Sequence, residues 1–146
     1  MHRTPSETAV NTALTELTHL LDAFLNQVPG SRFAVLASRD GLARCSAGLG
    51  RDGADTVAAL MSSLHSLGES SPDLFGVTPV QRVRQVVVEH DGYLLFVMAA
   101  AAGSLLAVCT GRETDAGVTG HEMQRLIARV GEHLGTPART GDGRER

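Results

Sequence analysis

The stretch VRQVVVEHDGYLLFVMAAAAGSLLAVCT, residues 83–110, decides the fold of this chain. It holds three runs of apolar and β-branched residues, at 83–90, 93–100 and 104–110, and such runs are typical of β-strands. The dipeptides Asp91-Gly92 and Ala102-Gly103 separate the runs and favour tight turns. Strands joined by tight turns run antiparallel, so we predict a three-stranded meander.

A membrane helix is the competing interpretation of the uncharged run from Gly92 to Gly111, because it approaches the length of a spanning helix. Gly103-Ser104 interrupts the run at its middle, and β-branched residues flank the turn signals. Two buried strands fit this pattern better, so we expect no membrane span.

An earlier segment predicts a second antiparallel pair. Residues 32–38 read as a strand, Arg39-Asp40-Gly41 supplies a turn, and residues 42–47 alternate between polar and apolar side chains. We therefore predict a hairpin at 32–47.

Two amphipathic helices flank the strands. Thr4-Pro5-Ser6-Glu7 combines a capping box with proline at the first helical position, and Pro29-Gly30 ends the helix that it starts. Thr119-Gly120-His121-Glu122 is a second capping box, before a helix that ends at Gly135. The apolar stripe of the first helix comprises Val10, Leu14, Leu17, Leu21, Phe24, Leu25 and Val28.

A further helix is predicted from Asp52 or Ala54 to Glu69, and no charged residue occurs between Asp55 and Glu69. We expect its core stripe to comprise Val57, Leu60, Met61, Leu64 and Leu67. The opposite face carries only short side chains, those of Ala59, Ser62, Ser63 and Ser66. A solvated helix face normally carries Glu, Lys or Arg, so this face is suited to close contact. An exposed face without significance is the alternative.

The resulting element order is α-β-β-α-β-β-β-α, which predicts an α/β (α+β) chain with one antiparallel sheet and helices on its faces. We assign residues 4–137 to a single domain. Residues 138–146 are polar and glycine-rich, and we expect them to form a disordered tail.

The segment GLGRDG places Gly48, Gly50 and Gly53 at the spacing of a dinucleotide-binding loop. That motif requires a βαβ unit, whereas the strand before it belongs to a hairpin and a meander follows. Asp52 would also set a carboxylate beside the pyrophosphate. We interpret the segment as a connection in which Asp52 or Asp55 caps the following helix. We expect no cofactor, and a nucleotide-binding or small-molecule sensor stays the alternative function.

Composition excludes several function classes. All 13 basic residues are arginine and the net charge is −3, which is unlike a nucleic-acid-binding protein. Cys45 and Cys109 form no metal-binding motif, and no signal peptide is visible, so we expect a cytoplasmic protein with buried, inert thiols. No Gly-x-Ser-x-Gly motif occurs, and we interpret His65 as a partly buried or interfacial histidine rather than a base. We expect no enzyme.

Three segments carry a resemblance to a known family: residues 33–42, residues 86–97 and residues 103–108, together with the helices around them. In this arrangement, over roughly residues 14 to 135, the chain resembles the Roadblock / dynein light chain family. In its short length and its Ala- and Gly-rich composition, the chain resembles members of the bacterial branch, which are regulators encoded beside small Ras-like GTPases.

The resemblance implies a five-stranded sheet with the 52–69 helix on one face and the other two helices on the opposite face. It also implies a homodimer, in which that helix packs on its mate and the third strands pair edge to edge. The helix contact would use Asp55, Ala59, Ser62, Ser63 and Ser66. The strand contact would use Arg84, Gln85, Val86, Val87 and Val88.

The resemblance further implies binding of a small Ras-like GTPase whose own residues perform hydrolysis. No catalytic residue transfers from the family to this chain, and the family pattern assigns no surface to the GTPase. Arg51 invites comparison with an arginine finger, but a solvated loop arginine is the better interpretation.

Overall fold

Helices and strands follow one another in the predicted order in the computed structural model, which describes residues 5–70 and 73–134. These described residues form three α-helices and five strands, with one 3₁₀ turn at Asp73–Phe75. The helices are α1 (Pro5–Gln27), α2 (Arg51–Gly68) and α3 (Ala116–His133), and the strands are β1 (Ser31–Ser38), β2 (Ala43–Ala47), β3 (Gln85–His90), β4 (Tyr93–Ala100) and β5 (Ser104–Thr110). The predicted tail at residues 138–146 lies outside the described residues, as do both ends of the predicted domain.

The strands form one sheet in the order β2-β1-β5-β4-β3, and every pair is antiparallel. The hairpin and the meander are joined by the long-range pair β1–β5, where Leu36 lies opposite Leu106. β5 lies at the centre of the sheet between β1 and β4, and all seven of its residues are buried. The uncharged run at 92–111 thus forms two strands, as predicted. Among the helices of residues 5–70 and 73–134, none has the length and hydrophobicity that a membrane span requires.

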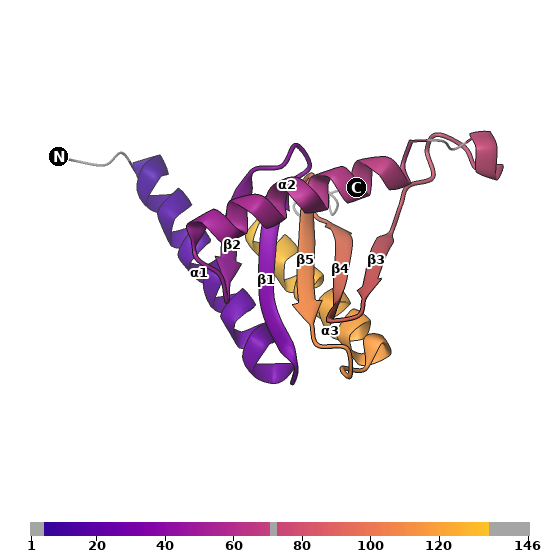
Figure 1. The fold of residues 1–146 in the computed structure, drawn as a ribbon. Coiled ribbons are helices and arrows are strands. Elements are labelled where there is room, and N and C mark those ends of the chain that lie inside the picture. Colours follow the sequence, from indigo (N-terminus) through magenta and orange to yellow (C-terminus); the bar gives the residue numbers. More distant parts are fainter. Residues whose placement is uncertain (1–4, 71–72, 135–146) are drawn as a thin grey trace, which may run out of the picture.

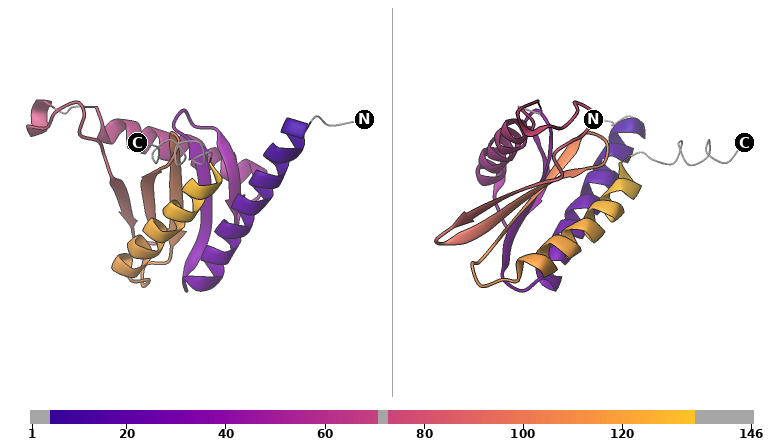
Figure 2. Two further views of the ribbon diagram at one scale, coloured as in Figure 1. Left: turned by 180° about the vertical axis from the view of Figure 1, so that it is seen from behind. Right: turned by 90° about the vertical axis from the view of Figure 1, so that its right-hand side faces the viewer.

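Helices cover the sheet unequally (Figures 1 and 2). α1 and α3 pack side by side on one face, and α2 crosses the other face alone. Strand residues alternate between the two layers, so that Leu36 of β1 belongs to the α1/α3 core while its neighbours Val35 and Ala37 belong to the α2 core. The fold is that of an α+β domain with the predicted placement of all three helices.

Some predicted boundaries are wrong. α3 begins at Ala116, because the carboxylate of Asp115 accepts a hydrogen bond from the Val118 amide at 3.0 Å and caps the helix. Thr119, which was expected to cap, lies inside the helix, and its hydroxyl donates to the Asp115 carbonyl at 3.0 Å. Val10 was expected in the core but is exposed, since the first turns of α1 extend past the sheet (Figure 1).

Candidate interaction surface

The buried side of α2 differs from the predicted one. Its buried residues are Ala54, Ala58, Met61 and His65. The prediction was wrong for Leu60 and for Leu67, which is 70% exposed. The two alanines allow the helix to lie close to the sheet, and the helix is therefore rotated so that the larger leucines face outward. An apolar ridge remains on the surface of α2.

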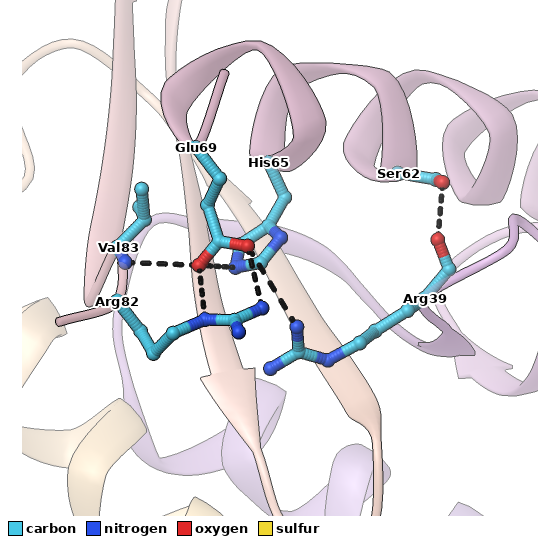
Figure 3. A network of polar contacts seen from close by, with 6 residues as sticks. All are labelled: Arg39, Ser62, His65, Glu69, Arg82 and Val83. Carbon is cyan, nitrogen blue, oxygen red and sulfur yellow. Dashed lines mark hydrogen bonds and ion pairs between the residues drawn. The ribbon is translucent and has the colours of Figure 1, made fainter. Parts of the chain in front are cut away.

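The residues that we expect at a dimer contact occupy the outer side of α2. Asp55, Ala59, Ser63 and Ser66 are exposed. Ser62 is half-buried, and its hydroxyl donates to the Arg39 carbonyl of the β1–β2 turn at 2.5 Å (Figure 3). Four of the five side chains are therefore accessible, and their role in a dimer stays a prediction.

The predicted strand contact lies at an edge of the sheet, because β3 has β4 as its one neighbour among the described strands. Gln85 and Val87 are exposed, whereas Val86 and Val88 are half-buried against the α2 core. Arg84 precedes the strand. The backbone groups on the outer side of β3 are free to pair with another strand.

Residues 73–83, named the arm below, connect the end of α2 to β3 and project beyond the sheet edge (Figure 1). Phe75 is 73% exposed and Val80 is 83% exposed. Leu74 and Val77 are exposed as well. A cavity of about 510 Å³ lies between the arm and the end of α2, lined by Gly68, Glu69, Phe75, Val77, Pro79, Gln81, Arg82 and Val83.

One carboxylate fixes the base of the arm (Figure 3). Glu69 accepts hydrogen bonds from Arg82 Nε at 2.9 Å and Nη2 at 2.7 Å, and from the Val83 amide at 3.0 Å. Arg39 Nη1 lies 3.9 Å from the same carboxylate. The hydrogen bond from Arg82 is the main reason that the pKa of Glu69 lies below its usual range. This group ties together three segments: α2, the arm and the β1–β2 turn.

His65 lies beneath this ion pair and is 4% exposed. Its Nε2 has no hydrogen-bond partner and lies 3.8 Å from Oε2 of Glu69. Burial lowers the pKa of His65; the nearby Arg39 and Arg82 also lower it, and Glu69 opposes them. The structure confirms a buried histidine. Sequence spacing could not reveal the charges around His65, because Arg39 and Arg82 are remote from it along the chain.

The GLGRDG segment connects β2 to α2. A side chain at Gly48 (φ +84°) would place its Cβ 2.3 Å from the Arg32 carbonyl oxygen. Gly50 occupies the cap position of α2 with no side-chain hydrogen bond, so the expected cap by Asp52 or Asp55 is wrong. Because all described strand pairs are antiparallel, the segment lies outside any βαβ unit.

The two cysteines are free and pack in different cores, Cys45 against the α1/α3 core and Cys109 in the α2 core. Burial raises the pKa of Cys45 to about 11 and raises that of Cys109 as well. Within the described ranges, no three His, Cys, Asp or Glu side chains are grouped closely enough to hold a metal ion.

Comparisons of sequence and structure relate this fold to known proteins. A sequence model of the Roadblock/LC7 domain matches residues 17–110. The crystal structure of a Roadblock/LC7 domain from Streptomyces avermitilis has 47% sequence identity and a TM-score of 0.75, over 80% of this chain and 96% of that chain. No curated protein matches the chain.

More distant structures share the fold. MglB from Myxococcus xanthus has 14% identity and a TM-score of 0.70, over 90% of this chain and 91% of that chain. Profilin II from Acanthamoeba castellanii has 12% identity and a TM-score of 0.56, over 80% of this chain and 97% of that chain. Together with the domain match and the close Streptomyces structure, the sheet order and helix placement lead to one conclusion: the chain belongs to the Roadblock/LC7 family.

Proposed function

We propose that the chain is a non-enzymatic dimeric regulator or scaffold that binds a small Ras-like GTPase in the cytoplasm. Family membership supports the class of function, and one observation about the surface supports the dimer. Seven of the ten large hydrophobic side chains exposed on the described residues lie on α2, the arm and β3: Leu60, Leu67, Leu74, Phe75, Val77, Val80 and Val87. Apolar side chains gathered in this way are typical of a protein interface.

The geometry of this region suits a second copy of the chain. The free edge of β3 can continue the sheet into a partner strand, which would satisfy its outer backbone groups. A two-fold axis beside β3 would bring the same surfaces of both copies together, so each contact would be self-complementary. The small residues Ala59 and Ser63 would let two α2 helices approach closely.

The GTPase is the partner that the family resemblance implies. MglC from Myxococcus xanthus, MglB from the same organism and an MglB described in a tetrameric arrangement share the fold. Arg51 is exposed in the first turn of α2 and has no assigned role. We therefore expect the chain to act by binding, and any stimulated hydrolysis to use residues of the GTPase.

The dimer is tested by sedimentation equilibrium at micromolar concentration. Ser66→Arg and Ser63→Glu should each shift the wild-type dimer toward monomer, because the contact would bury an unpaired charge. Ala128→Glu, at an exposed position on α3, is the matched control and should leave the dimer mass unchanged. A monomeric wild-type protein would contradict the dimer, and unchanged mass in both serine variants would place the contact elsewhere.

The partner is tested by pull-down with a small Ras-like GTPase encoded nearby, loaded with GDP or with GTP, and by following hydrolysis with and without the chain. Binding in at least one nucleotide state is expected. Failure in both states would remove the assignment of that partner. Titration with NAD, FAD or ATP tests the alternative, because a regulator of this kind should show no saturable binding of these nucleotides.

A further inference from the structure

We infer that the arm of each copy packs on α2 of the other copy, so that the two arms form a reciprocal clasp around the dimer. This inference rests on the proposed dimer and adds to it an interface element, which no family pattern in the sequence pointed to. The arm would be a main source of dimer stability and not a passive connection between α2 and β3.

The position of the arm identifies its partner. The arm leaves the end of α2 and extends outward past β3, away from the rest of its own chain (Figures 1 and 2). A chain that pairs with the outer edge of β3 must lie alongside the arm, and the proposed occupant of that edge is a second copy. Because a two-fold axis relates the copies, each arm would reach the α2 region of its partner.

The chemistry of the two surfaces matches. The arm has no charged side chain from Leu74 to Gln81. From Thr56 to Gly68, the only ionisable side chain of α2 is that of His65, which is buried and has a lowered pKa. Exposed Leu60 and Leu67 on α2 are the apolar counterpart of the exposed side chains on the arm. Packing these surfaces together removes apolar area from water without desolvating an ion.

The arm is also held ready for this contact. Its base is fixed by the hydrogen bonds between Glu69 and Arg82 and between Glu69 and the Val83 amide. A segment that is already positioned loses less conformational entropy on binding. The cavity between the arm and α2 is walled partly by Phe75 and Val77, and can receive an apolar side chain from the other copy.

The first test measures the dimer dissociation constant of the full chain by sedimentation. The double variant Phe75→Ser/Val80→Ser should raise this constant at least tenfold, because each copy loses two apolar contacts. Val118→Ser is the matched control, since Val118 is also exposed but lies on α3, on the face of the sheet opposite α2. The control should dimerise like the wild type. Circular dichroism of all variants should show the wild-type fold, because the substituted side chains are exposed.

The second test locates the arm by cross-linking. One preparation carries Leu74→Cys and a differently tagged preparation carries Leu67→Cys; mixing and mild oxidation should give a disulfide between unlike chains. Mixing Val118→Cys with Leu67→Cys should not, because Val118 lies on α3, on the opposite face of the sheet. The native thiols can stay in place, because Cys109 is buried, Cys45 is half-buried, and burial raises the pKa of both.

The outcomes separate this inference from the proposed function. A monomeric wild type would contradict the proposed dimer itself. A wild-type dimer with an unchanged dissociation constant in the arm variant would leave the dimer standing and overturn the clasp. A Leu67→Cys/Leu74→Cys chain that closes its disulfide within one copy, with no link between unlike chains, would show that the arm folds back on its own α2 and would also overturn the clasp.

Discussion

The two faces of the sheet are built differently. The α1/α3 face is covered by two helices that bury large side chains, among them Leu17, Leu21, Phe24 and Met123. The α2 face is covered by one helix, which buries two alanines, Met61 and His65, and turns leucines toward solvent. The first face is completed within the chain, while the second presents apolar side chains and a free strand edge.

This difference indicates how stability and association are divided in the molecule. Residues on the α1/α3 face contribute to folding through dense packing, so substitutions there should act on the free energy of unfolding. Exposed residues on α2 and the arm contribute little to the fold of one chain, so substitutions there should act on contact with a partner.

The largest expected effect separates the two faces directly. Leu21→Ala should lower the free energy of unfolding by about 2–5 kcal/mol, because it opens a cavity in the α1/α3 core. Leu67→Ala should change the unfolding of the monomer by less than about 0.5 kcal/mol, because Leu67 is mostly exposed. Urea unfolding at a protein concentration below the dimer range measures both. Similar losses in the two variants would contradict the division.

A second pair of variants tests how closely α2 lies on the sheet. Ala58→Leu should lower the free energy of unfolding by about 1–3 kcal/mol, because Ala58 is fully buried and a larger side chain would push the helix away. Ala59→Leu, one residue further along, points outward and should be nearly neutral for the monomer. Tolerance of leucine at position 58 would show that the layer is loosely packed.

The next prediction concerns the segment that connects β2 to α2. Gly48→Ala should cost about 1–2 kcal/mol from the left-handed backbone alone, and the close Arg32 carbonyl adds to this loss. Gly50→Ala should cost less than about 1 kcal/mol, because its backbone is extended and its surroundings are open. Thermal unfolding of both variants checks this order, and the reverse order would contradict the structural role assigned to Gly48.

The smallest expected effect concerns pH. Burial lowers the pKa of His65 from its ordinary value of 6.5, so below that pH the unfolded chain binds a proton that the folded chain resists. The free energy of unfolding should therefore fall as the pH drops through 6.5 toward the lowered pKa. His65→Gln should flatten this part of the profile, and His121→Gln, at an exposed position on α3, should not.

Glu69 acts in a lower pH range. Its pKa is lowered from the ordinary value of 4.5, so its contribution to the free energy of unfolding is lost only below that pH.

Local patterns predicted the strands, the turns and the three helices because each depends on residues close in sequence. The rotation of α2 could not be predicted in this way. Leucine at three- and four-residue spacing marked Leu60 and Leu67 as core. The sheet accepts only short side chains at Ala54 and Ala58, and that limit is set by the strands on which the helix packs and not by the helix's own sequence. The prediction of the residue that caps α3 was wrong for a local reason, since Asp115 lies one turn before Thr119 and caps the helix instead.

The link from Glu69 to Arg82 could not be foreseen either, because the two residues belong to different segments and form no spacing pattern. The residues predicted at the dimer contact are a separate case. Their identity came from the family resemblance, and a single chain shows only that Asp55, Ala59, Ser63 and Ser66 are accessible.

The sheet order also has a practical consequence for experiments in living cells. α1 is the first described element and α3 is the last, and both lie on the face opposite α2, where His133 of α3 reaches Glu16 of α1 at 3.3 Å. A fluorescent reporter joined before α1 or after α3 would therefore be attached on the layer remote from α2. Such fusions offer a way to follow partner recruitment while the α2 surface remains unobstructed.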